Sequence, residues 1–210
     1  MQIDFISDTV CPWCFIGKRR LTRAMAMRPD IPFTVRYRPY RLDPTVPREG
    51  VDRAAYMAAR FGADAKLLDA YKAIAAEGAK EDISFDWQAI LKRPNTIDSH
   101  RLIRWAEAQG VQDEVVERLF IAYFENGEDI GDIRVLADIA DLCGMDGGEV
   151  AAQIKADPAL KHIPVVFLTA LVSEHEALAG SVTRTGHRFV GKLVSSANLI
   201  AFIEQTLAQS

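Results

Sequence analysis

The stretch Asp8-Thr9-Val10-Cys11-Pro12-Trp13-Cys14 decides the fold of this 210-residue chain. Before it, apolar residues alternate at Ile3 and Phe5, which predicts a short strand over residues 2–7. After it, apolar residues between positions 15 and 25 recur at the spacing of a helix. A Cys-x-x-Cys pair is therefore expected where a strand gives way to a helix.

The start of a helix favours a thiolate. Free backbone N–H groups and the positive end of the helix dipole both lower the pKa of a thiol placed there. Cys11 is therefore predicted to be the exposed, attacking thiol. Cys14, one turn further on, is predicted to resolve a mixed disulfide or to close a disulfide with Cys11. Pro12 and Trp13 are expected to tune the pair through the geometry and packing of the helix start.

A pair of cysteines could instead supply half of a zinc site, which needs two more Cys or His ligands at suitable spacing. The remaining cysteine, Cys143, and four scattered histidines offer no such spacing, so no metal is expected. Cys143 itself stands among apolar neighbours, and we expect it to be a buried, inert thiol.

The composition narrows the class of protein. Hydrophobic residues make up 49% of the chain and charged residues 26%, which is typical of a globular protein able to bury a core. The net charge of −4 gives no general attraction to nucleic acid or to an anionic membrane. The sequence enters its first strand directly, without the pattern of a secretory signal, so a cytoplasmic location is expected.

The longer stretch Asp8-x-x-Cys11-Pro12-Trp13-Cys14-Phe15-Ile16-Gly17-Lys18 resembles the active-site signature of the DsbA-like thioredoxin superfamily. Within it, the sequence up to about residue 153 resembles the FrnE-type branch of mostly cytosolic thiol oxidoreductases. A sister branch, the kappa-class glutathione transferases and 2-hydroxychromene-2-carboxylate isomerases, typically has Ser in the place of Cys11. Keeping both cysteines favours redox chemistry. The resemblance implies an α/β fold, a thioredoxin-like sheet with a large all-helical insertion.

The rest of the pattern divides the chain into three parts. Residues 33–40 alternate in hydrophobicity and predict a second strand. The following helices are predicted at residues 51–61, 65–78, 97–109, 113–126, 133–143 and 148–156. We therefore expect residues 1–50 to be the first part of the thioredoxin-like domain, 51–156 the helical insertion, and 157–210 the closing strands and helix.

One predicted helix carries a second part of the resemblance. Asn95-Thr96 followed by Ser99-His100-Arg101 resembles the Asn-[Ser/Thr]…His-Arg helix of the FrnE-type branch. The resemblance implies that His100 lines the active site. From its residue type alone, His100 could equally be a packing or surface residue.

The tail departs from this family. Residues 154–170 resemble the fourth-strand region of a response-regulator receiver domain, and residues 189–193 resemble its fifth strand. Thr169 and Lys192 fall on the receiver's switch residue and phosphate-contacting lysine. The chain supplies neither the acidic Mg²⁺-binding pair nor the phospho-accepting Asp, so phosphoryl transfer is not expected.

The same tail can complete a thioredoxin sheet, and we favour that arrangement. In a DsbA-like protein, the first closing strand normally opens with a cis-proline that faces the cysteine pair. Ile163 and Pro164 fit this place and are expected to line the active site. A receiver also has a proline here, so the position is ambiguous. A helix in the connection 173–186 would favour parallel strands, and a hairpin antiparallel ones.

The predicted function is thiol–disulfide oxidoreduction by Cys11 and Cys14, with active-site residues Pro12, Trp13, His100, Ile163 and Pro164. The expected partner is a thiol or disulfide, in a protein or a small molecule, with no nucleic acid and no membrane. A homodimer remains open. No cofactor is expected beyond the redox-active disulfide, with glutathione left open. Two alternatives are a glutathione-dependent isomerase or transferase of the kappa-class type and a redox-inactive chimeric scaffold.

Overall fold

The computed structural model describes residues 1–62, 65–156, 166–169, 182–184 and 187–191. The chain forms two compact units, Met1–Ala156 and Asp157–Ser210. None of the described helices is long and apolar enough to cross a membrane.

The first unit opens with a strand–helix–strand. The strands β1 (Gln2–Ser7) and β2 (Thr34–Pro39) are parallel, and α1 (Pro12–Ala26) connects them. Gln2 lies opposite Thr34 at one end and Ser7 opposite Pro39 at the other. Because parallel strands end at the same edge, the chain after β1 and the chain after β2 emerge side by side. This edge is where the Cys-x-x-Cys stretch begins.

Helices dominate the remainder of the first unit, as the sequence predicts. The further elements are β3 (Val51–Asp52), α2 (Arg53–Phe61), α3 (Ala65–Ala79), β4 (Lys92–Arg93), α4 (Ile97–Gln109), α5 (Gln112–Phe124), α6 (Ile133–Leu142) and α7 (Gly147–Ala156). The expected helix at residues 51–61 starts two residues late, because Val51 and Asp52 pair with β4 in a short antiparallel ladder. Asp52 then caps α2 by accepting a hydrogen bond from the Ala55 N–H at 2.7 Å.

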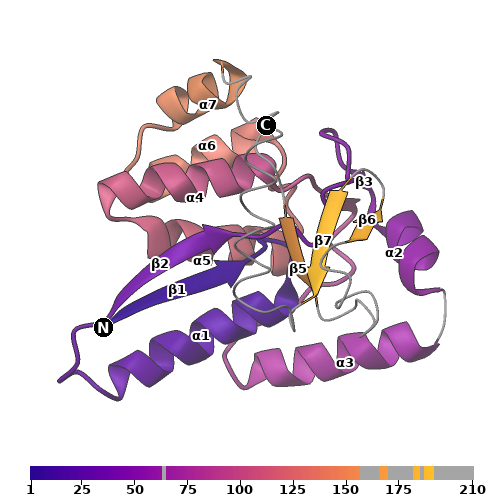
Figure 1. Ribbon diagram of the computed structural model, residues 1–210, viewed down its shortest axis with the longest axis horizontal. Coiled ribbons are helices and arrows are strands. Elements are labelled where there is room, and N and C mark those ends of the chain that lie inside the picture. Colours follow the sequence, from indigo (N-terminus) through magenta and orange to yellow (C-terminus); the bar gives the residue numbers. More distant parts are fainter. Residues whose placement is uncertain (63–64, 157–165, 170–181, 185–186, 192–210) are drawn as a thin grey trace. The chain divides into compact units, whose positions relative to one another are not determined.

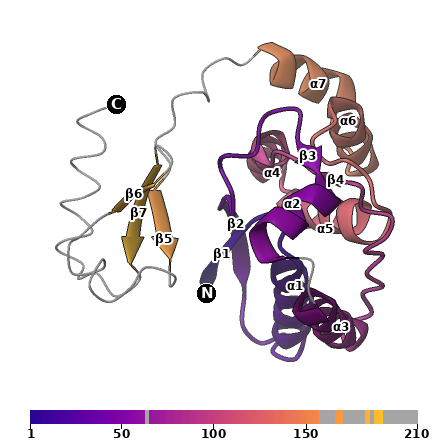
Figure 2. The ribbon, with the colours of Figure 1, turned by 90° about the vertical axis from the view of Figure 1, so that its right-hand side faces the viewer.

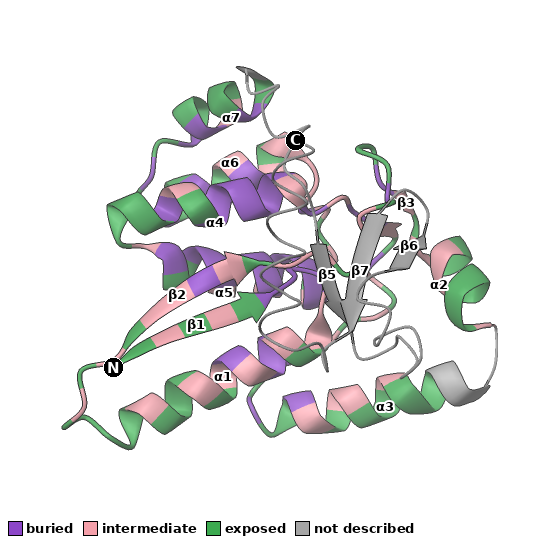
Figure 3. Cartoon of the chain, in the orientation of Figure 1, coloured by how far each residue is buried: buried purple, intermediate pink, exposed green. Residues whose placement is uncertain are grey.

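The core of the first unit gathers around α4 and α5, which are both rich in buried residues; those of α4 are purple in Figure 3. Both helices pack against β2, and α5 also contacts α1 (Figures 1 and 2). The fully buried side chains of these helices include Leu102, Ala106, Val115, Val116, Leu119 and Phe120. α1 therefore packs against a helix, α5, whose inner face is fully buried.

The second unit contains a small mixed sheet. β5 (Val166–Thr169) runs parallel to β7 (His187–Gly191), and β6 (Val182–Arg184) pairs with β7 in the antiparallel direction. The receiver resemblance implies a helix in the connection 173–186, whereas part of that stretch forms β6. Its β-branched Val182 and Thr183 favour a strand. Ile163 and Pro164, and the expected last helix, lie outside the described residues.

Candidate active site around Cys11 and Cys14

Cys11 is the N-cap of α1, as the strand-to-helix pattern predicts. Its backbone is extended (φ −101°, ψ 109°), and Pro12 occupies the first helical position. The Cys11 N–H donates to the Asp8 carbonyl at 3.0 Å, and the Cys14 N–H donates to the Cys11 carbonyl at 3.0 Å. The side chain of Cys11 makes no capping hydrogen bond to the first turn of α1. The free N–H groups of the first turn are therefore available to a thiolate.

The two thiols are driven in opposite directions. Both are free and partly buried. The Cys14 thiol donates a hydrogen bond to the Cys11 sulfur, and this bond, with the N–H groups of Cys14 and Trp13, lowers the pKa of Cys11 against the opposing effect of burial. The same hydrogen bond, together with burial, raises the pKa of Cys14 far above its ordinary value. The pair can therefore hold one thiolate, on Cys11.

Asp8 is a buried carboxylate next to this pair, at 1% exposure. Its Oδ2 accepts a hydrogen bond from the Leu42 N–H at 2.7 Å, and its Oδ1 lies 3.4 Å from His100 Nε2. Burial opposes ionisation, but His100, the charge of Arg93 and the Leu42 N–H outweigh it, so that the pKa of Asp8 is lowered. A charged Asp8 in turn acts to raise the pKa of both Cys11 and Cys14.

His100 lies in the first turn of α4 and is buried. Its Nε2–H donates to the Tyr40 carbonyl at 3.1 Å, since a carbonyl oxygen can only accept. One residue before it, Ser99 forms a 2.8 Å hydrogen bond with Thr9 in the turn that precedes Cys11. Ser99 thereby ties the N-terminus of α4 to the cysteine stretch, and the neighbouring His100 lies close to Asp8.

The other predicted site residues divide into two groups. Pro12 is partly buried, and Trp13 is 52% exposed beside the thiols. An aromatic side chain that exposed is available to contact a substrate. Ile163 and Pro164 are outside the described residues, so the structure places no partner from them at the thiols.

The sequence analysis did not identify Asp8 as a residue that influences the two thiols. Asp8 forms part of the quoted signature, but its role depends on contacts with Leu42, His100 and Arg93, far away in the sequence. A useful signal would have been an acidic residue at the end of an apolar strand, where burial is expected.

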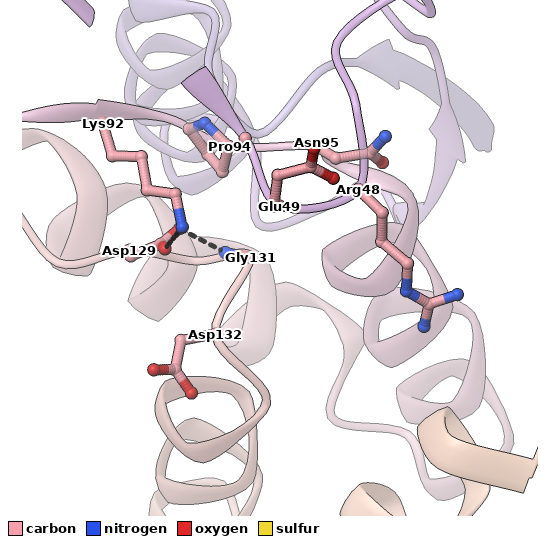
Figure 4. Close-up of a pocket in the computed structure, with 9 residues that line it drawn as sticks. Arg48, Glu49, Lys92, Pro94, Asn95, Asp129, Gly131 and Asp132 are labelled. Carbon is pink, nitrogen blue, oxygen red and sulfur yellow. Dashed lines mark hydrogen bonds and ion pairs between the residues drawn. The ribbon is translucent and has the colours of Figure 1, made fainter. Parts of the chain in front are cut away.

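A separate polar cavity of about 200 Å³ lies between β4 and the start of α6 (Figure 4). Lys92 Nζ and Asp129 Oδ2 are 2.7 Å apart in its wall, and Asp129 also accepts a hydrogen bond from the Gly131 N–H at 3.0 Å. Asp132 caps α6. These charged groups are already paired, and neither Cys11 nor Cys14 lines the cavity. We assign it no catalytic part.

Cys143 is the C-cap of α6 and is buried in the core, away from solvent. Burial raises the pKa of its thiol, with a smaller contribution from the charge of Glu114. A thiol that is both buried and hard to ionise is a poor nucleophile. Among the described residues, no three His, Cys, Asp or Glu side chains gather as a metal site.

A strand leads into a helix that starts at the cysteine pair, and a block of helices holds His100. This arrangement can be compared with known families. Residues 2–163 match the DSBA-like thioredoxin domain family. The chain belongs to this family. Its fold is the DsbA-like thioredoxin fold, an α/β architecture with a helical insertion.

A bacterial protein and several solved structures are similar to this chain. It is 24% identical over 155 residues to the uncharacterised protein YwbO of Bacillus subtilis, covering 74% of this chain and 72% of that protein. A probable DsbA oxidoreductase from Streptomyces coelicolor superposes with a TM-score of 0.69 at 23% identity, covering 100% of this chain and 91% of the other.

Two more distant structures share the fold. The cytosolic disulfide reductase DsbM of Pseudomonas aeruginosa has a TM-score of 0.55 at 16% identity, covering 100% of both chains, and has also been solved with GSH. A 2-hydroxychromene-2-carboxylate isomerase has a TM-score of 0.53 at 16% identity, covering 100% of this chain and 95% of the other. Because reductases and isomerases both have this fold, the fold does not choose between their activities.

Proposed function

We propose that this DsbA-like protein is a thiol–disulfide oxidoreductase of the FrnE type, acting through Cys11 and Cys14. The observation that carries the proposal is the asymmetry of the two thiols. Cys11 has a lowered pKa at the helix start, and Cys14 has a raised one. A two-step exchange needs a stable thiolate that attacks the substrate and a neighbouring protonated thiol that reacts in the second step.

The reaction we propose conserves electrons in two steps. The Cys11 thiolate attacks one sulfur of a disulfide, forming a mixed disulfide and releasing the other sulfur as a thiolate. Cys14 then loses its proton and attacks the Cys11 sulfur, releasing the second thiolate and leaving a Cys11–Cys14 disulfide. The protein dithiol is oxidised and the substrate disulfide is reduced. The reverse sequence oxidises a substrate dithiol.

Several surrounding residues support the two steps. We propose that Asp8 and His100 are positioning residues, because both are buried and Asp8 lies against the turn that holds Cys11. Exposed Trp13 would contact the substrate beside the attacking sulfur. On the family resemblance, Ile163 and Pro164 remain our candidates for further residues of the active site.

The proposed partners are disulfides and thiols, in proteins or small molecules, rather than nucleic acid or membrane. We propose glutathione as the small thiol that exchanges with the pair, since the disulfide reductase DsbM, of the same fold, was solved with GSH. We propose a cytoplasmic location, because that reductase is described as cytosolic. A homodimer is a separate proposal, and measurement of the molecular mass in solution would test it.

Insulin reduction tests the function. With a thiol as electron donor, the wild-type protein should accelerate precipitation of the reduced insulin B chain. Cys11→Ser should abolish the acceleration and Cys14→Ser should reduce it strongly, because the mixed disulfide can no longer be resolved within the protein. Cys143→Ala is the matched control and should retain full turnover, since its thiol is buried and outside the site.

Two outcomes would contradict the proposal. A wild-type protein without turnover against any disulfide would favour a redox-inactive scaffold. A Cys14→Ser variant as active as the wild type would favour the glutathione-dependent isomerase or transferase, which needs only one sulfur at Cys11.

A further inference from the structure

The turn that leads into Cys11 is buried and closed by its own backbone. The Cys11 N–H donates to the Asp8 carbonyl at 3.0 Å, which encloses Thr9 and Val10 in the turn. Asp8 and Thr9 are each 1% exposed, and Val10 is 5% exposed. Cys11 follows directly as the N-cap of α1, so a side chain that fixes this turn also fixes the position of Cys11.

One side chain of this turn reaches the helical insertion. The Thr9 hydroxyl lies 2.8 Å from the hydroxyl of Ser99, which is in the first turn of α4 and 90 residues away in the sequence. Ser99 is fully buried, and its hydroxyl donates to the Thr96 carbonyl at 2.9 Å. Because each hydroxyl has a single proton, Thr9 is the donor and Ser99 the acceptor of the bond between them.

The far end of these two hydrogen bonds is fixed by α4 itself. The Thr96 carbonyl, at the N-cap of α4, also accepts the His100 N–H at 3.1 Å, which begins the hydrogen bonds of the helix. A serine that donates to a carbonyl three residues earlier has its hydroxyl held against its own helix. Ser99 therefore offers Thr9 an acceptor whose position is set by the helical insertion.

The turn has a second attachment on the side of the sheet. Asp8 Oδ2 accepts the Leu42 N–H at 2.7 Å, so the turn is held by the chain after β2 as well as by α4. Hydrogen bonds weaken steeply when their distance and angle depart from the optimum. A thiolate that depends on N–H groups at a helix start is therefore sensitive to the position of the turn that carries it.

We propose that Thr9 and Ser99 are a positioning pair for Cys11, in which the hydrogen bond between their side chains holds the turn so that the Cys11 sulfur meets the N–H groups of the first turn of α1. The inference rests on the proposed function, because it adds two positioning residues to the same thiol pair. Both residues act through the backbone of the turn and take no part in the exchange of sulfur. The helical insertion thereby contributes to the thiol chemistry through a neutral hydrogen bond.

Two substitutions of Thr9 separate its hydroxyl from its packing. Thr9→Val keeps the shape of the side chain and removes the hydroxyl. It should decrease the acid ionisation constant of Cys11 by about threefold to tenfold, the scale of one hydrogen bond. Thr9→Ser keeps the hydroxyl and removes a buried methyl group, so it should lower the midpoint of urea unfolding and keep the ionisation constant close to that of the wild type.

Ser99→Ala and the double variant extend the same comparison. Ser99→Ala leaves the Thr9 hydroxyl buried without its acceptor, so it should lower both the midpoint of unfolding and the ionisation constant of Cys11. In the double variant of Thr9→Val and Ser99→Ala, neither hydroxyl remains to be left unpaired. The midpoint should therefore recover relative to Ser99→Ala, whereas the ionisation constant should stay as low as in the single variants. A purely structural role would move the two quantities together.

Iodoacetamide labelling as a function of pH measures the ionisation constant, with mass spectrometry to identify the labelled sulfur. Equilibration with glutathione and its disulfide, at a pH above the measured pKa of wild-type Cys11, gives a second readout. Thr9→Val should shift this equilibrium toward the protein disulfide by up to the same factor, because the reduced form loses stabilisation of its thiolate. Thr22→Val and Ser84→Ala are the matched controls, since both residues are exposed, and they should change neither readout.

The outcomes separate the two proposals. If the wild type exchanges with no disulfide, the thiol–disulfide function is wrong, and the labelling still decides on the pair. If the wild type exchanges but Thr9→Val ionises Cys11 as the wild type does, the positioning pair is wrong and the function stands. An ionisation constant that follows the midpoint of unfolding across the series would also overturn the pair. If Ser99→Ala fails to fold, the comparison of Thr9→Val with Thr9→Ser decides the question.

Discussion

Cys11 and Cys14 differ because one proton is shared between two sulfurs in an asymmetric setting. The Cys14 thiol donates to the Cys11 sulfur, and the N–H groups of the first turn of α1 reach Cys11 as well. Asp8 works against both thiols through its negative charge. The pKa of Cys11 is thus set by two opposing effects: the helix start and Cys14 lower it, and the charge of Asp8 raises it.

Replacing Asp8 tests this balance. Asp8→Asn removes the charge but keeps an oxygen that can accept the Leu42 N–H, so the loop should stay in place. We expect the pKa of Cys11, already lowered in the wild type, to fall further. Iodoacetamide labelling of Cys11 as a function of pH measures it.

The matched control at this scale is Asp4→Asn. Asp4 is in the same strand but is exposed, and it lies 3.4 Å from both Arg36 and Arg38. Its replacement should leave the titration of Cys11 unchanged. A rise in the pKa of Cys11 in Asp8→Asn, or labelling of Cys14 before Cys11, would refute the balance described here.

At the scale of the element, α1 is fixed to α5 directly behind the cysteines. Phe15, the residue after Cys14, is fully buried and stacks on Phe120 with ring centroids 5.1 Å apart. One turn further on, the ammonium of buried Lys18 lies 3.1 Å from Asp113 and 2.9 Å from Glu117. The start of the helix, and therefore the thiolate position, depends on packing that the first turn cannot provide by itself.

Phe15→Ala tests that dependence. Removing a fully buried ring should lower the free energy of unfolding by about 3–5 kcal/mol, from lost burial and the cavity left behind. Phe61→Ala is the control, because Phe61 lies at the end of α2 and is 55% exposed, and it should cost less than about 1 kcal/mol. Urea unfolding at neutral pH measures both. An equal loss of unfolding free energy in both variants would show that the packing of Phe15 on Phe120 does not anchor α1.

At the scale of the whole molecule, the lowered pKa of Cys11 couples folding to redox state. A thiol whose pKa is depressed on folding contributes stability above its unfolded value of ~8.5, and that stability is lost as the pH falls through the folded pKa. Only the reduced protein has this thiolate. Ionisation of Cys11 in the fold should therefore stabilise the reduced form relative to the oxidised form, by an amount that depends on pH.

The stability of reduced protein minus that of oxidised protein should accordingly increase as the pH is raised from 5 to 8, by at most about 1.4 kcal/mol for each unit of lowered pKa. The upper limit of pH 8 matters because the pKa of Cys14 is raised in the fold, so ionisation of Cys14 in the unfolded chain would destabilise the protein at higher pH. Urea unfolding with and without dithiothreitol provides the comparison. Cys11→Ser should show no difference between the two conditions, and a flat profile in the wild type would contradict the coupling.

The fold was readable from the sequence wherever a signal was local. The alternation before Cys11 predicted β1 with its observed bounds, and the helical pattern that ends at Gly110 predicted α4 at Ile97–Gln109. Local signals were insufficient for β3 and β4, because a two-residue ladder depends on its partner rather than on its own sequence. The family resemblance pointed to His100, whose side chain the structure places within 3.4 Å of Asp8.

The sequence by itself determined the strand-to-helix position of Cys11 and Cys14, because helix starts, strands and the dipole effect on a thiol all act within a few residues. Only the tertiary structure brought Asp8 together with the Leu42 N–H and His100, and within the influence of the charge of Arg93. Their charges act across space, and their mutual influence depends on burial and distance, neither of which is encoded in the spacing along the chain.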